Sequence, residues 1–93
     1  MSAYVIASFT PRDQQQLQQY GAAAAETIAQ FSGEFLVKGP AQVLSGDFEF
    51  KNQVIIQFPS LEKAQSWYQS DAYQALIPLR EKGMEASFQL VGA

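Results

Sequence analysis

The sequence contains no cysteine and no histidine among its 93 residues. Without cysteine the chain can form no disulfide, no thiolate nucleophile and no thiolate metal site. Without histidine it also lacks the commonest general base and metal ligand. The sequence therefore implies no metal site and no cofactor, and it offers no motif for a catalytic residue.

Charged residues are also scarce, at 16% of the chain, with a net charge of -3. No run of basic residues could follow a phosphate backbone, so we expect no nucleic-acid partner. The apolar stretch at residues 4–9 has no basic leader and is too short for a signal peptide or a membrane span. We therefore expect a cytoplasmic protein without a membrane partner.

Length and composition predict a single globular domain over residues 1–93. A chain of this size hides only about 60 to 65% of its unfolded surface when it folds alone. A second copy of the chain would increase that burial, which favours an oligomer.

The patterning of the first half predicts a strand, a helix and a hairpin. Residues 4–9 form the strand, Thr10 caps the following helix with Pro11 in its first turn, and Gly33 ends that helix. A second strand at residues 35–37 stops at Gly39-Pro40, and a short extended piece follows at residues 41–45. Residues 48–50 and 54–58 then indicate an antiparallel hairpin.

The second half predicts an interrupted helix and a closing strand. Ser60 caps the helix, and Asp71 with Gln74 resembles a capping box that restarts it before Pro78. Residues 86–91 form the last strand. The order β, α, β, β, α, β indicates an α+β fold, a ferredoxin-like antiparallel sheet with its helices on one face.

Alternation along the strands divides the sheet into two faces. The expected helix-covered face holds apolar residues: Val5, Ala7, Phe9, Phe35, Val37, Val54, Ile56, Phe58, Phe88 and Leu90. The opposite face is mixed in character: Tyr4, Ile6, Ser8, Glu34, Leu36, Lys38, Ile55, Gln57, Ser87, Gln89 and Val91. This second face is too apolar for free solvent, so we expect a homodimer formed through the open sheet face.

Six segments together resemble a known family: Gly33-Glu34-Phe35-Leu36-Val37-Lys38-Gly39, Leu44-Ser45-Gly46-Asp47-Phe48, Phe58-Pro59-Ser60, Trp67-Tyr68-Gln69-Ser70, Tyr73 and Leu79-Arg80. In order and over nearly the whole chain, they resemble the bacterial domain-of-unknown-function family numbered 1330. The resemblance implies the dimeric α+β barrel superfamily, which includes antibiotic-biosynthesis monooxygenases and proteins similar to muconolactone isomerase, chlorite dismutase and polyketide cyclases. It implies the fold and not one reaction.

The sequence departs from that family at three positions. The family often has a basic residue at Glu34, frequently Arg at Asn52 and commonly an acidic residue at Thr10. The remaining basic position is Lys38, and a lysine cannot reproduce the bidentate fork of an arginine. Any anion site that depends on these positions is therefore in doubt.

Six residues are candidates for contacting a ligand: Tyr4, Lys38, Trp67, Tyr68, Tyr73 and Arg80. The aromatic residues could line a pocket for a flat organic ligand, or they could simply pack in the core and the dimer. Arg80 could bind a carboxylate ligand or form a salt bridge, and Lys38 could pair with Glu34 on the same strand face or with the partner subunit. Ser70 is interpreted as a helix cap.

Two functions remain open at this point. One is a homodimeric small-molecule-binding protein, which could be a cofactor-independent enzyme acting on a small ring or carbonyl substrate. The other is a non-catalytic dimeric structural or interaction module, in which the aromatic residues are core. The sequence does not decide whether the protein is an enzyme.

Overall fold

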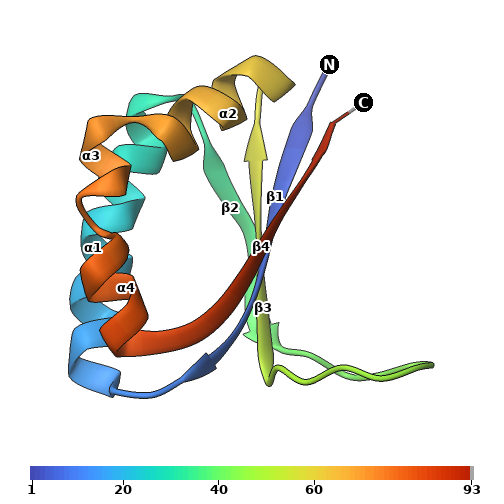
Figure 1. The fold of residues 1–93 in the computed structure, drawn as a ribbon. Coiled ribbons are helices and arrows are strands. Elements are labelled where there is room, and N and C mark those ends of the chain that lie inside the picture. The colour runs from blue at the N-terminus through green and yellow to red at the C-terminus, as the bar shows by residue number, and fades with distance from the viewer. Residues whose placement is uncertain (93) are drawn as a thin grey trace.

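The computed structural model describes residues 1–92, and it has one antiparallel sheet covered on one face by helices (Figure 1). The strands are β1 (Ala3–Pro11), β2 (Glu34–Pro40), β3 (Asn52–Phe58) and β4 (Met84–Gly92), in the spatial order β2-β3-β1-β4. The helices are α1 (Gln14–Gln30), α2 (Leu61–Gln69), α3 (Asp71–Gln74) and α4 (Ile77–Gly83). The ferredoxin-like prediction is confirmed, and the sheet of one chain is not closed into a barrel.

The beginning of α1 differs from the prediction. Strand β1 continues through Pro11, which pairs with Met84 of β4, so Thr10 and Pro11 are strand residues. Asp13 caps the helix instead, and its carboxylate accepts a hydrogen bond from the Gln16 amide at 3.0 Å. The cause lies in a distant segment, because the amides of Arg12 and Asp13 both donate to the carbonyl of Gly83.

The end of α1 also differs from the prediction. Ser32 adopts the left-handed conformation there, with φ of 62°, and Gly33 does not. Gly33 instead allows close packing, since a Cβ at this position would lie 2.6 Å from Phe58 Cε1 and 2.7 Å from Ile28 Cγ2. The glycine is therefore needed for the contact between α1 and β3.

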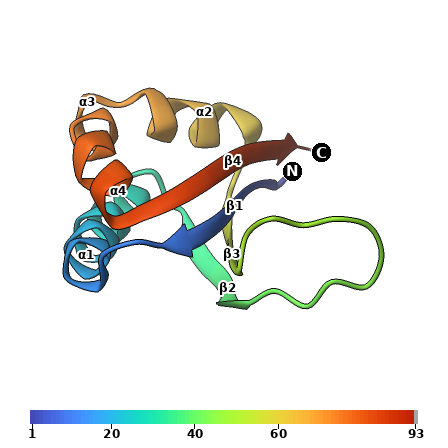
Figure 2. The same ribbon diagram turned by 60° about the horizontal axis from the view of Figure 1, so that its bottom comes forward.

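The predicted hairpin between residues 48–50 and 54–58 is wrong. Strand β3 pairs with β2, and residues 41–51 form a connecting loop in which neither 41–45 nor 48–50 is a strand. Phe48 and Phe50 contact each other within this loop, with ring centroids 6.0 Å apart. Figures 1 and 2 show the loop projecting from the sheet on the side away from the helices.

Two serine caps begin the short helices α2 and α3. Ser60 caps α2 as predicted, accepting a hydrogen bond from the Lys63 amide at 3.1 Å. Ser70, and not Asp71, caps α3, because its hydroxyl accepts from the Tyr73 amide at 3.2 Å. Pro78 lies in the first turn of α4, where backbone N–H groups have no partner within the helix, so the missing N–H of proline costs no hydrogen bond.

A β-bulge in β2 changes which residues face the helices. The register shifts between Phe35 and Val37, so Phe35 pairs with Ile56, Val37 with Ile55 and Lys38 with Val54. Assigning Val37 to the helix-covered face and Lys38 to the open face is therefore wrong. Glu34 pairs with Gln57 on the open face, so Glu34 and Lys38 lie on opposite faces and cannot form the expected pair.

Candidate functional site

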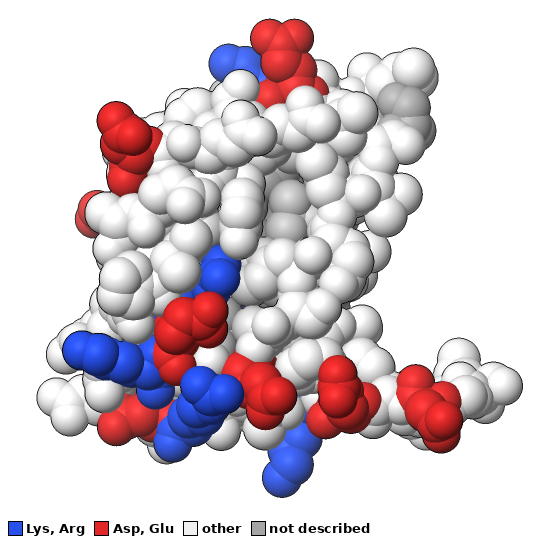
Figure 3. Space-filling model, viewed as in Figure 1, with Lys and Arg blue, Asp and Glu red and all other residues white. Residues whose placement is uncertain are grey.

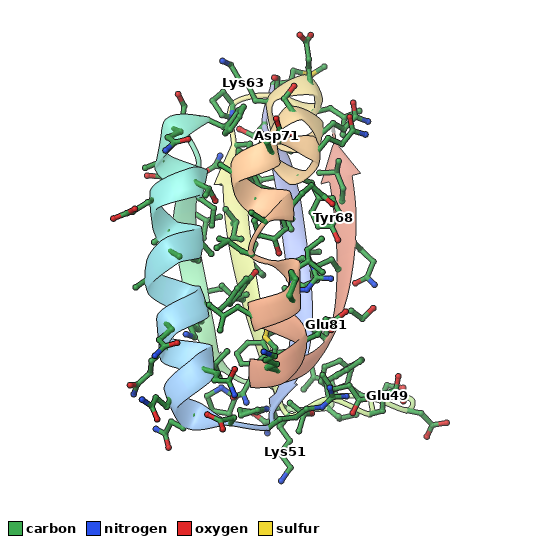
Figure 4. The ribbon with its side chains drawn as sticks, turned by 60° about the vertical axis from the view of Figure 1, so that its left-hand side comes forward. Glu49, Lys51, Lys63, Tyr68, Asp71 and Glu81 are labelled. Atoms are coloured by element: carbon green, nitrogen blue, oxygen red, sulfur yellow. The ribbon has the colours of Figure 1, made fainter. Side chains whose placement is uncertain are left out.

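Four of the predicted site residues meet between the helices and the sheet. Trp67 and Tyr68 come from α2, Tyr73 from α3 and Arg80 from α4, and the Trp67 and Tyr73 ring centroids are 4.4 Å apart. Trp67 and Tyr73 are fully buried, whereas Tyr68 is half-buried. Figure 4 shows Tyr68 extending from α2 toward β4, where the centroids of the Tyr68 and Phe88 rings are 6.1 Å apart.

Arg80 is the cation at the centre of this cluster. The residue is only 9% exposed, and its Nη1 donates to the hydroxyls of both Tyr68 and Tyr73 at 3.1 Å. The guanidinium also lies 4.8 Å from the Phe88 ring centroid, within cation–π range, and its Nη2 is 3.6 Å from Glu81. Burial lowers the pKa of Arg80, but the hydrogen bonds to the two tyrosines outweigh it and the net pKa is raised.

Tyr20, which the sequence patterns did not single out as a site residue, completes the hydrogen-bonded chain. The hydroxyl of Tyr20, on α1, lies 2.6 Å from the Tyr73 hydroxyl, and distance alone allows either to donate. Arg80 donates to the same Tyr73 hydroxyl, so Arg80, Tyr73 and Tyr20 form one hydrogen-bonded chain.

Both buried tyrosines keep their protons at neutral pH. Burial raises the pKa of Tyr20, and the proximity of Tyr73 raises it further. Burial also raises the pKa of Tyr73, although its hydrogen bonds with Tyr20 and Arg80 act in the opposite direction. These hydroxyls can therefore act as neutral hydrogen-bond donors but not as tyrosinate bases.

Trp67 is held by a second hydrogen-bond chain. Its indole Nε1 donates to Thr27 Oγ1 at 3.0 Å, and the Thr27 hydroxyl donates to the Ala24 carbonyl at 2.8 Å. The polar atom of Trp67 is therefore satisfied inside the protein, and the ring presents an apolar surface.

A cavity of about 290 Å³ lies between α1 and the sheet. Its apolar lining includes Phe9, Leu17, Trp67, Met84 and Phe88. The hydroxyl-bearing residue in this lining is Tyr20, and Lys38 is its one charged residue within the part of the chain that the structure describes. The volume lies just below the roughly 300 to 1,000 Å³ typical of ligand pockets, so the cavity suits a small molecule.

The remaining predicted residues are distributed around this cavity. Lys38 lines it because of the bulge, whereas Tyr68 lines a second hollow of about 260 Å³ between α2 and β4. Tyr4 lies on the open sheet face, opposite Gln57 and Val91, and does not join the cluster. In Figure 3 the surface over the helices and β4 carries few charges, most of which gather at the lower end and on the projecting loop.

No grouping of three or more acidic side chains within residues 1–92 could hold a metal ion. No helix in the described part of the chain is long and apolar enough to cross a membrane.

A family model covers residues 2–93 of the chain. The chain belongs to the DUF1330 family, a domain of unknown function. This membership confirms the resemblance predicted from the sequence. No curated protein shows significant similarity to this DUF1330 chain.

Solved structures share the fold of this DUF1330 protein at low identity. A protein of unknown function from Rhodopseudomonas palustris has a TM-score of 0.78 and 12% identity, covering 99% of this chain and 82% of its own. SnoaB, a cofactor-independent oxygenase from Streptomyces nogalater, has a TM-score of 0.71 and 12% identity, with 99% and 92% covered. A dimeric ferredoxin-like protein of unknown function from Thermobifida fusca has a TM-score of 0.66 and 13% identity, with 100% and 92% covered. At such identities the likeness establishes the fold alone.

Proposed function

We propose that this protein is a homodimer that binds a small organic molecule in the cavity between α1 and the sheet. The observation that carries the proposal is a largely apolar cavity whose lining includes two residues with polar side chains, Tyr20 and Lys38. A few fixed polar groups in an apolar pocket are typical of small-molecule sites.

The non-catalytic structural module fits the interior less well. A structural core is expected to be filled at close-packed density, with few voids larger than a water molecule. The hollow of about 290 Å³ is open to solvent and leaves apolar side chains such as Phe35 without packing partners.

Helix α1 offers a matched pair of variants that test the cavity. Gly21 lines the cavity, and a Cβ there would meet no atom within 4 Å, so Gly21→Leu extends into the empty space. Ala22→Leu adds a similar side chain on the exposed side of the same helix. We expect cinnamamide, a small neutral aromatic amide, to bind the wild type and Ala22→Leu but not Gly21→Leu in calorimetric titrations. Equal binding to all three proteins would contradict the proposed site.

The homodimer is supported by the uncovered sheet face. Ile6 and Ile55 pair on this face, next to the exposed apolar side chains of Val37 and Val91, which are 56% and 54% exposed. Similar structures are described as dimeric. Burying these side chains against a second copy removes apolar surface from water, which favours association.

The exposed position of Val37 makes a direct test of the dimer possible. Val37→Glu places a charge where the single chain is open to water, so the fold is retained, but the dimer interface would bury that charge. We expect sedimentation to give a dimer for the wild type and a folded monomer for this variant. Leu61→Glu, 44% exposed at the start of α2, is the matched control and stays dimeric. A dimeric Val37→Glu protein would contradict an interface through this face.

A further inference from the structure

Lys38 is the one charged side chain that lines the cavity among the described residues. The bulge between Phe35 and Val37 turns Lys38 toward the helix-covered side of the sheet. Its Nζ lies 5.9 Å from the centroid of the Phe9 ring, which lines the same cavity. A strand without the bulge would place Lys38 on the opposite face, so the bulge puts a cation at an apolar site.

The Lys38 ammonium has no carboxylate partner in residues 1–92. The ion pair found there joins Arg80 to Glu81, with 3.6 Å between Nη2 and Oε1. Lys38 belongs to the edge strand β2 and is exposed, so solutes can reach its ammonium from solvent. The cavity therefore has a cation at its β2 side that no acidic side chain of the described chain neutralises.

Arg80 does not serve as a second anion receptor in this cavity. Its Nη1 donates to the hydroxyls of Tyr68 and Tyr73, and the residue is absent from the cavity lining. The positive charge available to a bound molecule is therefore that of Lys38.

We propose that the ligand is a small organic monocarboxylate with an apolar body, whose carboxylate pairs with Lys38. Its apolar body lies against Phe35 and Leu17, which line the same cavity and are open to solvent. One positive charge matches one negative charge, whereas a doubly charged phosphate would leave a charge uncompensated in a mainly apolar site. This inference rests on the proposed function, and it adds the charge and the chemical class of the bound molecule.

Two pairs of probes of equal shape test the charge: benzoate with benzamide, and cinnamate with cinnamamide. Calorimetric titrations at low salt compare each carboxylate with its neutral amide on the wild type, Lys38→Met and Lys38→Arg. Lys63→Met is the matched control, because it removes the same charge from an exposed position on α2. We expect the wild type to bind each carboxylate about two to five times more tightly than its amide, as for an exposed charge pair.

The preference for the carboxylate should disappear in Lys38→Met, persist in Lys63→Met and be largely retained in Lys38→Arg. Equal affinity of the wild type for both members of each pair would overturn the inference about charge and leave the proposed binding function standing. A Lys38→Met protein that keeps the full preference for the carboxylate would likewise overturn the inference about charge and leave the proposed binding function standing. If neither member of either pair binds the wild type, both the inference and the proposed function are contradicted.

Discussion

The hydroxyls of Tyr73 and Tyr20 lie 2.6 Å apart and join α3 to α1 across the core. Arg80 donates to the same Tyr73 hydroxyl from α4, so one phenol connects three helices. This contact also couples the packing of the helices to the cavity, because Tyr20 is part of the cavity wall.

Replacing Tyr73 by Phe tests that connection. Tyr73→Phe removes the hydroxyl while keeping the ring, and it leaves the buried groups of Tyr20 and Arg80 with one partner fewer. We expect the free energy of unfolding to fall by about 1 to 3 kcal/mol in chemical denaturation. Tyr4→Phe, on the open face, is the control and should change it by less than about 0.5 kcal/mol. Equal effects of the two changes would contradict the structural role of the Tyr73 hydroxyl.

The single tryptophan allows a second hydrogen bond to be tested by fluorescence. Thr27→Val removes the acceptor of the Trp67 indole N–H and leaves that donor buried without a partner. The expected loss of stability is about 1 to 3 kcal/mol, with a change in Trp67 emission. Thr27→Ser retains the hydroxyl, so it should keep most of the wild-type stability and most of the wild-type Trp67 emission. An unchanged emission spectrum in the valine variant would show that the hydrogen bond is absent in solution.

Two glycines should respond to alanine in opposite directions. Gly33→Ala pushes a methyl group against Phe58 and Ile28, and we expect a loss of about 1 to 3 kcal/mol. Gly21→Ala has no atom within 4 Å and lies inside α1, where alanine stabilises a helix by about 0.5 to 1 kcal/mol. Thermal unfolding of the two variants measures whether each one is stabilised or destabilised. A stabilised Gly33→Ala protein would be inconsistent with the packing between α1 and β3.

The buried tyrosines predict a loss of stability in alkaline solution. Tyr20 and Tyr73 have raised pKa values in the folded protein, relative to an ordinary value of 10.0, so the unfolded chain releases these protons first. Their contribution is fully present below pH 10.0 and is lost as the pH rises above it. Denaturation at a series of pH values should show this fall, and Tyr20→Phe should make it shallower. Identical slopes for the two proteins would count against a buried, protonated Tyr20.

Much of the fold could be predicted because it depends on local patterns. The alternation in residues 54–58, the helical spacing of Leu17, Tyr20 and Ala24, and the cap at Ser60 all report structure within a few residues. The start of α1 could not be placed in this way. It depends on the amides of Arg12 and Asp13 reaching Gly83, far along the chain.

The site was harder to predict for the same reason. The block containing Trp67, Tyr68 and Tyr73 pointed to the aromatic cluster, whereas Tyr20 is 53 residues from the hydroxyl that it contacts. A tyrosine on the apolar stripe of a helix was the available signal, since a buried phenol usually needs a partner. The bulge that moves Lys38 is set by pairing with β3, and no turn or glycine signal in residues 35–38 marks it.

Native mass spectrometry of gently purified protein tests whether the dimer holds a small molecule between α1 and the sheet. We expect the wild type and Ala22→Leu to appear as dimers carrying a small organic molecule, and Gly21→Leu to appear as a dimer without it. A wild-type protein that stays bare when cinnamate is supplied, or a Gly21→Leu protein with the same added mass as the wild type, would contradict a ligand site between α1 and the sheet.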